Sequence, residues 1–138
     1  MILLAALLLQ IQTPPPPAPA PSPVTAPAPP ADWTQLPDLP LARRWPTGPS
    51  LSQYVQGEVA AGRCAAAQHG GDGFVLRVDM AVLIDNNGAV RRIVPRAIGC
   101  PTVEQYSAGI VSRLTRDNVP APQADTWYRT ALTFTWKD

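Results

Sequence analysis

Every second residue from Phe74 to Ile84 is apolar, and this period of two predicts a β-strand over residues 74–84. One face of the strand carries six apolar residues: Phe74, Leu76, Val78, Met80, Val82 and Ile84. The opposite face is only partly polar, since Arg77 and Asp79 stand there among further apolar residues. We therefore expect the first face to line the core of the domain.

The segment Asp85-Asn86-Asn87-Gly88 follows this strand directly. Asn-Gly is a strong hairpin signal because both residues tolerate positive φ angles. A return strand is predicted over residues 89–94, ended by Pro95. The pair Arg91-Arg92 interrupts its alternation, which indicates a bulge or a solvent-facing edge.

A helix is predicted before the hairpin. Ser50 has the position of an N-cap residue, with Gln53 completing a capping box. Apolar residues then recur at helical spacing: Leu51, Tyr54, Val55 and Val59. The helix is expected to end near Gly62 or to continue to Gln68, and the glycine-rich segment 69–73 breaks it.

A second helix is predicted after the hairpin, with Thr102 as its cap and Gln105 completing the capping box. Its apolar stripe consists of Val103, Tyr106, Ile110, Val111 and Leu114. Arginines at 113 and 116 suit the C-terminal end of the helix dipole, and Asn118 can terminate the helix.

A last strand is predicted over residues 127–136, because its residues alternate as well. One face carries Tyr128, Thr130, Leu132, Phe134 and Trp136, and the other carries Trp127, Arg129, Ala131, Thr133 and Thr135. The order of elements is α-β-β-α-β. The expected fold class is α+β, with a three-stranded antiparallel sheet and the helices packed on it.

Composition divides the chain into three parts. Residues 1–13 begin with nine apolar residues, about 13–14 Å of helix, against a bilayer core of about 30 Å. They fit a signal peptide or a short apolar anchor. Residues 14–49 form a Pro-rich linker, with ten of the 18 prolines between 14 and 30, and its part from Asp32 to Pro49 is a candidate strap on the domain. Residues 50–138 form the folded domain.

Two other interpretations of the N-terminus stay open: a misplaced start codon that truncates a longer anchor, and a soluble cytoplasmic protein. A signal peptide or short anchor predicts a periplasmic or secreted protein with weak membrane association at its N-terminus. A longer true N-terminus would instead anchor the protein to the inner membrane.

The chain has two cysteines, Cys64 and Cys100, 36 positions apart. An even count in an exported chain predicts a disulfide, which would stabilise a domain of this size by about 3–4 kcal/mol. Two buried free thiols are the alternative. The cysteines lack metal-ligand spacing and only one histidine accompanies them, so no metal site is expected.

Charge and motifs give little support to catalysis. The net charge of +1 is too balanced to predict nucleic-acid binding. The glycine-rich segment 70–73 leads into a strand, whereas a phosphate-binding loop precedes a helix. The segment 85–88 lacks the alternating oxygen ligands of a calcium loop, and His69 is expected at the surface. We expect no cofactor and no enzymatic activity.

The hairpin pattern Val78-x-Met80-x-Val82-x-Ile84-Asp85-x-x-Gly88-x-Val90-x-x-Ile93 resembles that of the TonB C-terminal domain, within the TonB/TolA-like fold. The following helix, the segment Asn118-Val119-Pro120-Ala121 and the closing strand are similar to that family as well. The resemblance covers residues 74–138, and the apolar start and Pro-rich spacer are similar to the overall layout of the family.

This resemblance implies a protein-interaction module of the periplasm whose last strand lies at the sheet edge and accepts an extended segment of an envelope protein. The candidate partner-binding residues are those facing outward: Trp127, Arg129, Thr133 and Thr135. For Trp127, a partly buried structural role is the alternative to contact with a partner. Three other hypotheses are carried: an Arg-rich second strand that binds anionic envelope components, a structural or accessory envelope protein, and a periplasmic enzyme.

Overall fold

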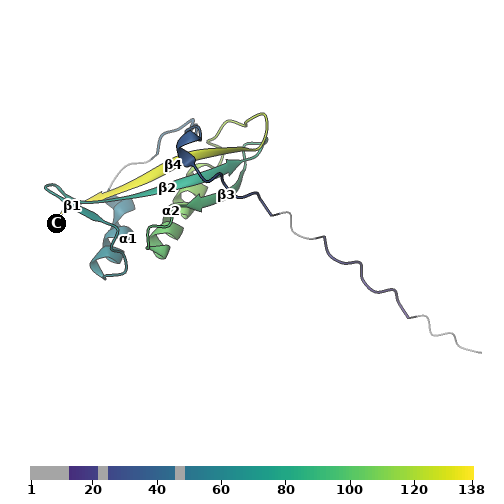
Figure 1. The fold of residues 1–138 in the computed structure, drawn as a ribbon, viewed down its shortest axis with the longest axis horizontal. Coiled ribbons are helices and arrows are strands. Elements are labelled where there is room, and N and C mark those ends of the chain that lie inside the picture. Colours follow the sequence, from purple (N-terminus) through teal and green to yellow (C-terminus); the bar gives the residue numbers. More distant parts are fainter. Residues whose placement is uncertain (1–12, 22–24, 46–48) are drawn as a thin grey trace, which may run out of the picture.

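The computed structural model describes residues 13–21, 25–45 and 49–138, so the expected export segment lies outside the described residues except for Thr13. Two α-helices pack on one face of a four-stranded antiparallel sheet (Figure 1). The elements in chain order are the 3-10 turn η1 (Trp33–Gln35), α1 (Pro49–Ala60), β1 (Gln68–Gly70), β2 (Gly73–Ile84), β3 (Val90–Pro95), α2 (Pro101–Leu114) and β4 (Thr126–Trp136). Within the described ranges, no helix has the length and apolar character needed to cross a bilayer.

The sheet is organised around β2. This strand pairs with β4 along its whole length, from Phe74 opposite Trp136 to Ile84 opposite Thr126. Its other edge pairs with β1 near the start and with β3 near the end. The prediction of an α+β fold is confirmed, and β4 is a strand at the edge of the sheet.

The predicted number of strands is wrong by one. Residues 68–70 form β1, a short fully exposed strand that returns into β2 through a tight turn. The turn requires Gly73, which has φ +116° and leaves no room for a side chain, because a Cβ atom there would collide with the carbonyl oxygen of Trp136. Three exposed residues carry no alternation, so the sequence pattern gave no signal for this strand.

The predicted hairpin is confirmed. Gly88 takes φ +81°, and the carboxylate of Asp85 accepts hydrogen bonds from the amides of Asn87 and Ala89. The pairing shifts between Leu83, opposite Arg92, and Ile84, opposite Val90. Arg91 therefore occupies the bulge that the Arg-Arg pair indicated.

Both predicted helix caps are wrong. The helices begin at Pro49 and Pro101, one residue before the predicted caps Ser50 and Thr102, and for α2 the N-cap is Cys100. Proline suits the first turn of a helix because its φ is already helical and its missing amide is not needed there. The hydroxyl of Thr102 donates instead to Glu58 across the helix pair.

The core lies between the helices and the facing side of the sheet. Residues 76–84 of the predicted β2 face are buried there together with Val103, Ile110 and Val111 of α2, and Leu132 and Phe134 of β4 join them. Phe74, Tyr106 and Leu114 of the predicted faces are half-buried. Fully buried residues of this core include Val55, Val78, Met80, Val82, Ile84, Cys100, Val103 and Val111. Trp136 is half-buried and stacks on Phe74, with ring centroids 5.4 Å apart.

The predicted disulfide between Cys64 and Cys100 is confirmed. It joins the segment after α1 to the residue that begins α2, and both cysteines are buried. The crosslink therefore fixes the relative position of the two helices at one end.

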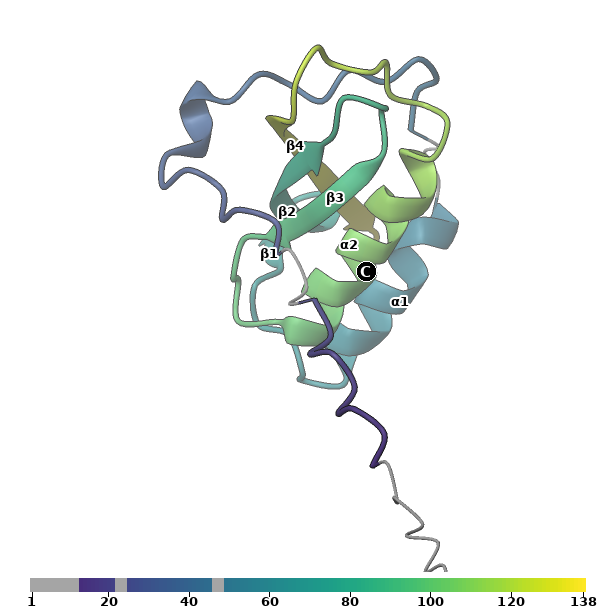
Figure 2. The same ribbon diagram turned by 90° about the vertical axis from the view of Figure 1, so that its right-hand side faces the viewer.

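Residues 32–45, which we call the strap, wrap around the domain. The strap begins with η1 on the face opposite the helices and passes to the helical side (Figures 1 and 2). Leu39 is 9% exposed and belongs to the core, and the backbone of Ala42 and Arg43 bonds to Asn118. Contacts of the folded domain thus extend well before residue 50, into the expected linker.

We predict that Leu39→Ala lowers the free energy of unfolding by about 2–3 kcal/mol, because it removes a buried side chain and leaves a cavity. Urea unfolding followed by circular dichroism measures the change. Val75→Ala is the matched control, since Val75 is 43% exposed and its truncation should cost less than about 0.5 kcal/mol. Equal effects of the two changes would show that the strap adds little stability.

We further predict that replacing Cys64 and Cys100 together by serine lowers the free energy of unfolding by about 3–4 kcal/mol, because the unfolded chain regains the freedom of the closed loop. Intact mass after alkylation without reductant is the companion measurement on the wild-type protein. Two alkyl adducts on folded protein would contradict the crosslink.

Candidate functional site

The outer edge of β4 carries backbone groups that point away from the sheet. The amide of Arg129 donates to the carbonyl of Pro37, outside the ladder with β2, so the groups of Arg129 face outward. The pairing of β4 with β2 has no register shift. In an antiparallel ladder the outward positions recur every second residue, which places the amides and carbonyls of Ala131, Thr133 and Thr135 on the outer edge.

Two of these outward positions have partners within the chain. Arg129 pairs with the strap through a parallel β-bridge to Asp38, and the amide of Thr135 donates to the hydroxyl of Ser52, at 3.1 Å. No hydrogen bond from the described residues reaches the outward groups of Ala131 and Thr133. The open part of the edge is therefore short and lies toward the end of β4.

A groove of about 1100 Å³ runs beside this open part. Its walls come from the strap, the start of α1, the turn between β1 and β2, and β4 itself. On β4 the lining consists of residues 131–136, and Lys137 follows directly after the strand. The larger apolar side chains around them are Trp45, Leu51, Phe74 and Val75. The groove thus combines open backbone groups with apolar contact surface.

The structure divides the four residues predicted to bind a partner. Thr133 and Thr135 are exposed and line the groove. Arg129 forms an ion pair with Asp38 of the strap at 2.7 Å. Trp127 is half-buried and lies outside the groove lining. The sequence pattern found the outward face, but it did not show that the strap occupies the half of the edge around Arg129.

The arginines of β3 and of the segment after it are engaged by the chain itself. Arg91 pairs with Asp125 at 3.3 Å, and Arg92 donates to the carbonyls of Ala26 and Pro27. The guanidinium of Arg96 lies 4.5 Å from the centre of the Trp33 ring, which is a cation–π contact. Arg92 and Arg96 thus fasten the N-terminal segment to the domain, and Arg91 is paired within it. These contacts weaken the hypothesis of an anion-binding second strand.

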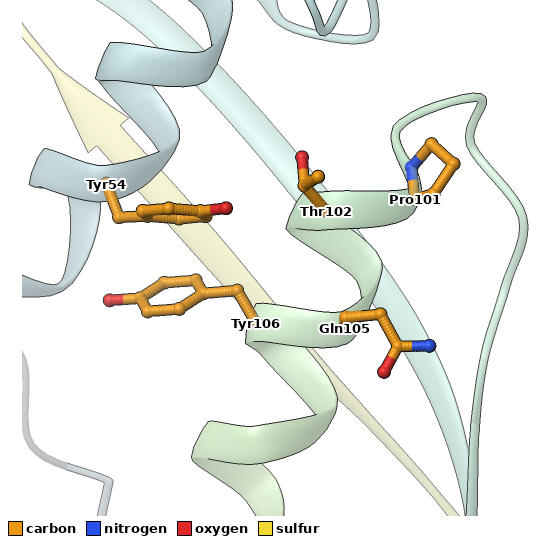
Figure 3. Close-up of a pocket in the computed structure, with 5 residues that line it drawn as sticks. All are labelled: Tyr54, Pro101, Thr102, Gln105 and Tyr106. Atoms are coloured by element: carbon orange, nitrogen blue, oxygen red, sulfur yellow. The ribbon is translucent and has the colours of Figure 1, made fainter.

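A second, shallower cleft lies between the helices. The rings of Tyr54 on α1 and Tyr106 on α2 are tilted by 38° with their centroids 4.6 Å apart, beside Pro101, Thr102 and Gln105 (Figure 3). The hydroxyl of Tyr106 donates to the carbonyl of Leu51, so this ring is held in place from within the domain. The cleft has a volume of about 500 Å³.

Next to this cleft, the carboxylate of Glu58 joins α1 to the start of α2. Its side chain is 8% exposed, and it accepts hydrogen bonds from the guanidinium of Arg63 and the hydroxyl of Thr102. The bonds from Arg63 first, and then that from Thr102, hold the pKa of Glu58 below its ordinary value of 4.5. This carboxylate belongs to the framework of the helix pair.

Among the described residues, no three His, Cys, Asp or Glu side chains gather closely enough to hold a metal ion. His69 lies at the surface, where its ring bonds to Asp138 at 2.9 Å.

Comparison of the chain with protein-family models, curated proteins and solved structures finds no match.

We predict that the Glu58 carboxylate makes stability depend on pH in the acid range. Because its folded pKa lies below 4.5, its contribution is present above that pH and is lost as the pH falls through the folded pKa. Glu58→Gln should therefore lower the unfolding temperature at pH 7, and the difference from wild type should shrink in acid. Asp72→Asn, at an exposed turn position, is the control of equal charge. A difference that stays constant down to the acid limit would contradict the prediction.

Proposed function

We propose that the protein is a non-enzymatic interaction module of the cell envelope that binds an extended segment of a partner protein by strand addition to β4. The observation that carries the proposal is the open outer edge at Ala131 and Thr133. Unpaired amides and carbonyls in a row are the recognition elements for an added strand. The expected partner is a protein of the periplasm or outer membrane.

The groove supports the same interpretation energetically. A backbone hydrogen bond formed on binding contributes only about 0.5–1.5 kcal/mol net, so a few pairs at a short edge give weak affinity alone. Apolar burial contributes about 25 cal/mol per Å². Trp45 and Leu51 beside the edge offer such surface to the side chains of an added strand.

The resemblance to the TonB C-terminal domain also supports the proposal. The order of elements that it implies is hairpin, helix and closing strand, and the closing strand of this chain lies at a sheet edge. We therefore propose for this domain both the TonB/TolA-like fold and binding by strand addition. No cofactor is required, because the recognition groups are those of the backbone.

The proposed location is the periplasm or the extracellular space. The apolar start of the chain favours export, and a disulfide is compatible with an oxidising compartment. Weak membrane association at the N-terminus, or anchoring to the inner membrane if the true N-terminus is longer, would tether the domain through the Pro-rich segment.

One observation favours a second candidate, a structural or accessory envelope protein without a binding edge. The strap already covers the edge of β4 at Arg129. A chain that protects its own edge lowers the risk of unwanted strand pairing.

We predict that Thr133→Pro weakens partner binding while the domain stays folded. The amide of Thr133 points outward, so proline removes a donor from the open edge without removing a bond of the ladder with β2. The loss of one hydrogen bond and the bulk of the ring should weaken binding at least about fivefold. Pull-down of a partner from envelope extract, followed by amide exchange of the complex, is the measurement.

Thr133→Val is the matched control, because it keeps the amide and the shape of the side chain. It should bind like wild type, and all variants should unfold cooperatively in thermal scans. A captured partner that leaves exchange at Ala131 and Thr133 unchanged would reject strand addition at this edge. Protection at residues 91–96 instead would favour the basic second strand.

A further inference from the structure

The strap occupies the edge of β4 in the way an added strand would. The amide of Arg129 donates to the carbonyl of Pro37, and the carbonyl of Arg129 accepts from the amide of Leu39, both at 2.9 Å. This is the pattern of a parallel β-pair centred on Asp38 and Arg129. A segment of the chain itself therefore uses the recognition groups that the proposed function assigns to a partner.

The side chains of the strap add two specific contacts. Asp38 accepts a hydrogen bond from Nε of Arg129 at 2.7 Å, on the face of the sheet away from the helices. The next residue, Leu39, points to the opposite side and is buried in the core. A second donor of Arg129, Nη1, bonds to the carbonyl of Thr34. Arg129 thus donates hydrogen bonds to both a carboxylate and a backbone carbonyl of the strap.

The pairing ends on both sides of Asp38 for reasons visible in the sequence. Proline at position 37 has no amide to donate to the carbonyl of Trp127. After Leu39 the chain leaves the edge, and the amide of Ala42 donates to the carbonyl of Asn118. Ala131 and Thr133 follow directly along β4, so the open part of the edge adjoins the part that the strap covers.

We propose that the strap is an intramolecular ligand of the β4 edge, and that the partner is an extended segment of the same chemistry, a carboxylate followed by an apolar residue. This inference rests on the proposed function and deepens it. The partner runs parallel to β4, places its carboxylate on Arg129 and continues along Ala131 and Thr133, where the strap does not reach.

The contacts of the strap differ in how easily a competitor replaces them. The Asp38 side chain is 83% exposed and that of Arg129 is 44% exposed, so their ion pair is accessible to solvent and weak. Leu39 is buried and holds the strap more firmly. A partner therefore begins at the open residues, displaces Asp38, and gains most when its own apolar residue takes the place of Leu39.

The test uses the full chain and a labelled synthetic peptide with the sequence of residues 34–41. We expect Asp38→Asn in the protein to speed exchange of the Arg129 amide and to tighten peptide binding, each about two- to fivefold, because an exposed ion pair is lost from the competing strap. Fluorescence anisotropy gives the affinity. A peptide with asparagine at position 38 should bind the same variant more weakly.

Arg129→Gln in the protein should weaken binding of the acidic peptide relative to the Asp38→Asn variant. If Arg129→Gln does not fold, Arg129→Lys replaces it, since lysine keeps the charge but offers one nitrogen in place of the separate Nε and Nη1 that bond Asp38 and Thr34. Equal affinity for the acidic and the asparagine peptide overturns the inference, as does undetectable peptide binding by the Asp38→Asn variant.

The two proposals fail separately. An envelope partner that protects Ala131 and Thr133, together with a peptide that does not bind, leaves the proposed function standing and rejects the strap as a ligand. A peptide that protects Arg129, together with an envelope partner that leaves the whole of β4 unprotected, rejects the proposed function instead.

Discussion

The uninterrupted pairing of β2 with β4 is the constraint on which the rest of the structure depends. Because this ladder has no bulge, the parity of each residue on the 11-residue β4 fixes both the face of its side chain and the direction of its backbone groups. Even-numbered residues place Leu132 and Phe134 in the core. Odd-numbered residues face away from the helices and direct their amides to the outer edge. A single insertion in either strand would exchange the two sets.

An edge strand with open amides is a liability as well as a binding site, and this chain limits its length at both ends. The strap takes the position at Arg129, and Ser52 of α1 takes the amide of Thr135. Between them stand Ala131 and Thr133, flanked by the groove. The edge is thus long enough for a few pairs with a ligand but short for uncontrolled association between chains.

Much of the fold follows from the sequence, because long periodic segments leave little choice. The alternation of residues 74–84 and 127–136 and the stripe of α2 reappear as buried faces. The predictions of the helix caps failed because a proline, whose φ is already helical, begins each helix one residue before the predicted cap. The strand β1 was missed because its three exposed residues have no alternation of apolar and polar side chains. The contact between Asp38 and Arg129 spans 91 positions, and local patterns carry no information on such a pairing.

The two walls of the groove are held by different contacts, so the position of α1 and the exposure of the β4 edge can change independently. The wall formed by α1 is held by the disulfide after the helix and by Glu58, which bonds to Thr102 at the start of α2. The wall formed by the strap is held by Leu39 and by Asn118, whose side chain bonds to both the amide and the carbonyl of Arg43. Loss of the crosslink should therefore disturb the groove through α1, whereas release of Asp38 should lengthen the open edge and leave the helices in place.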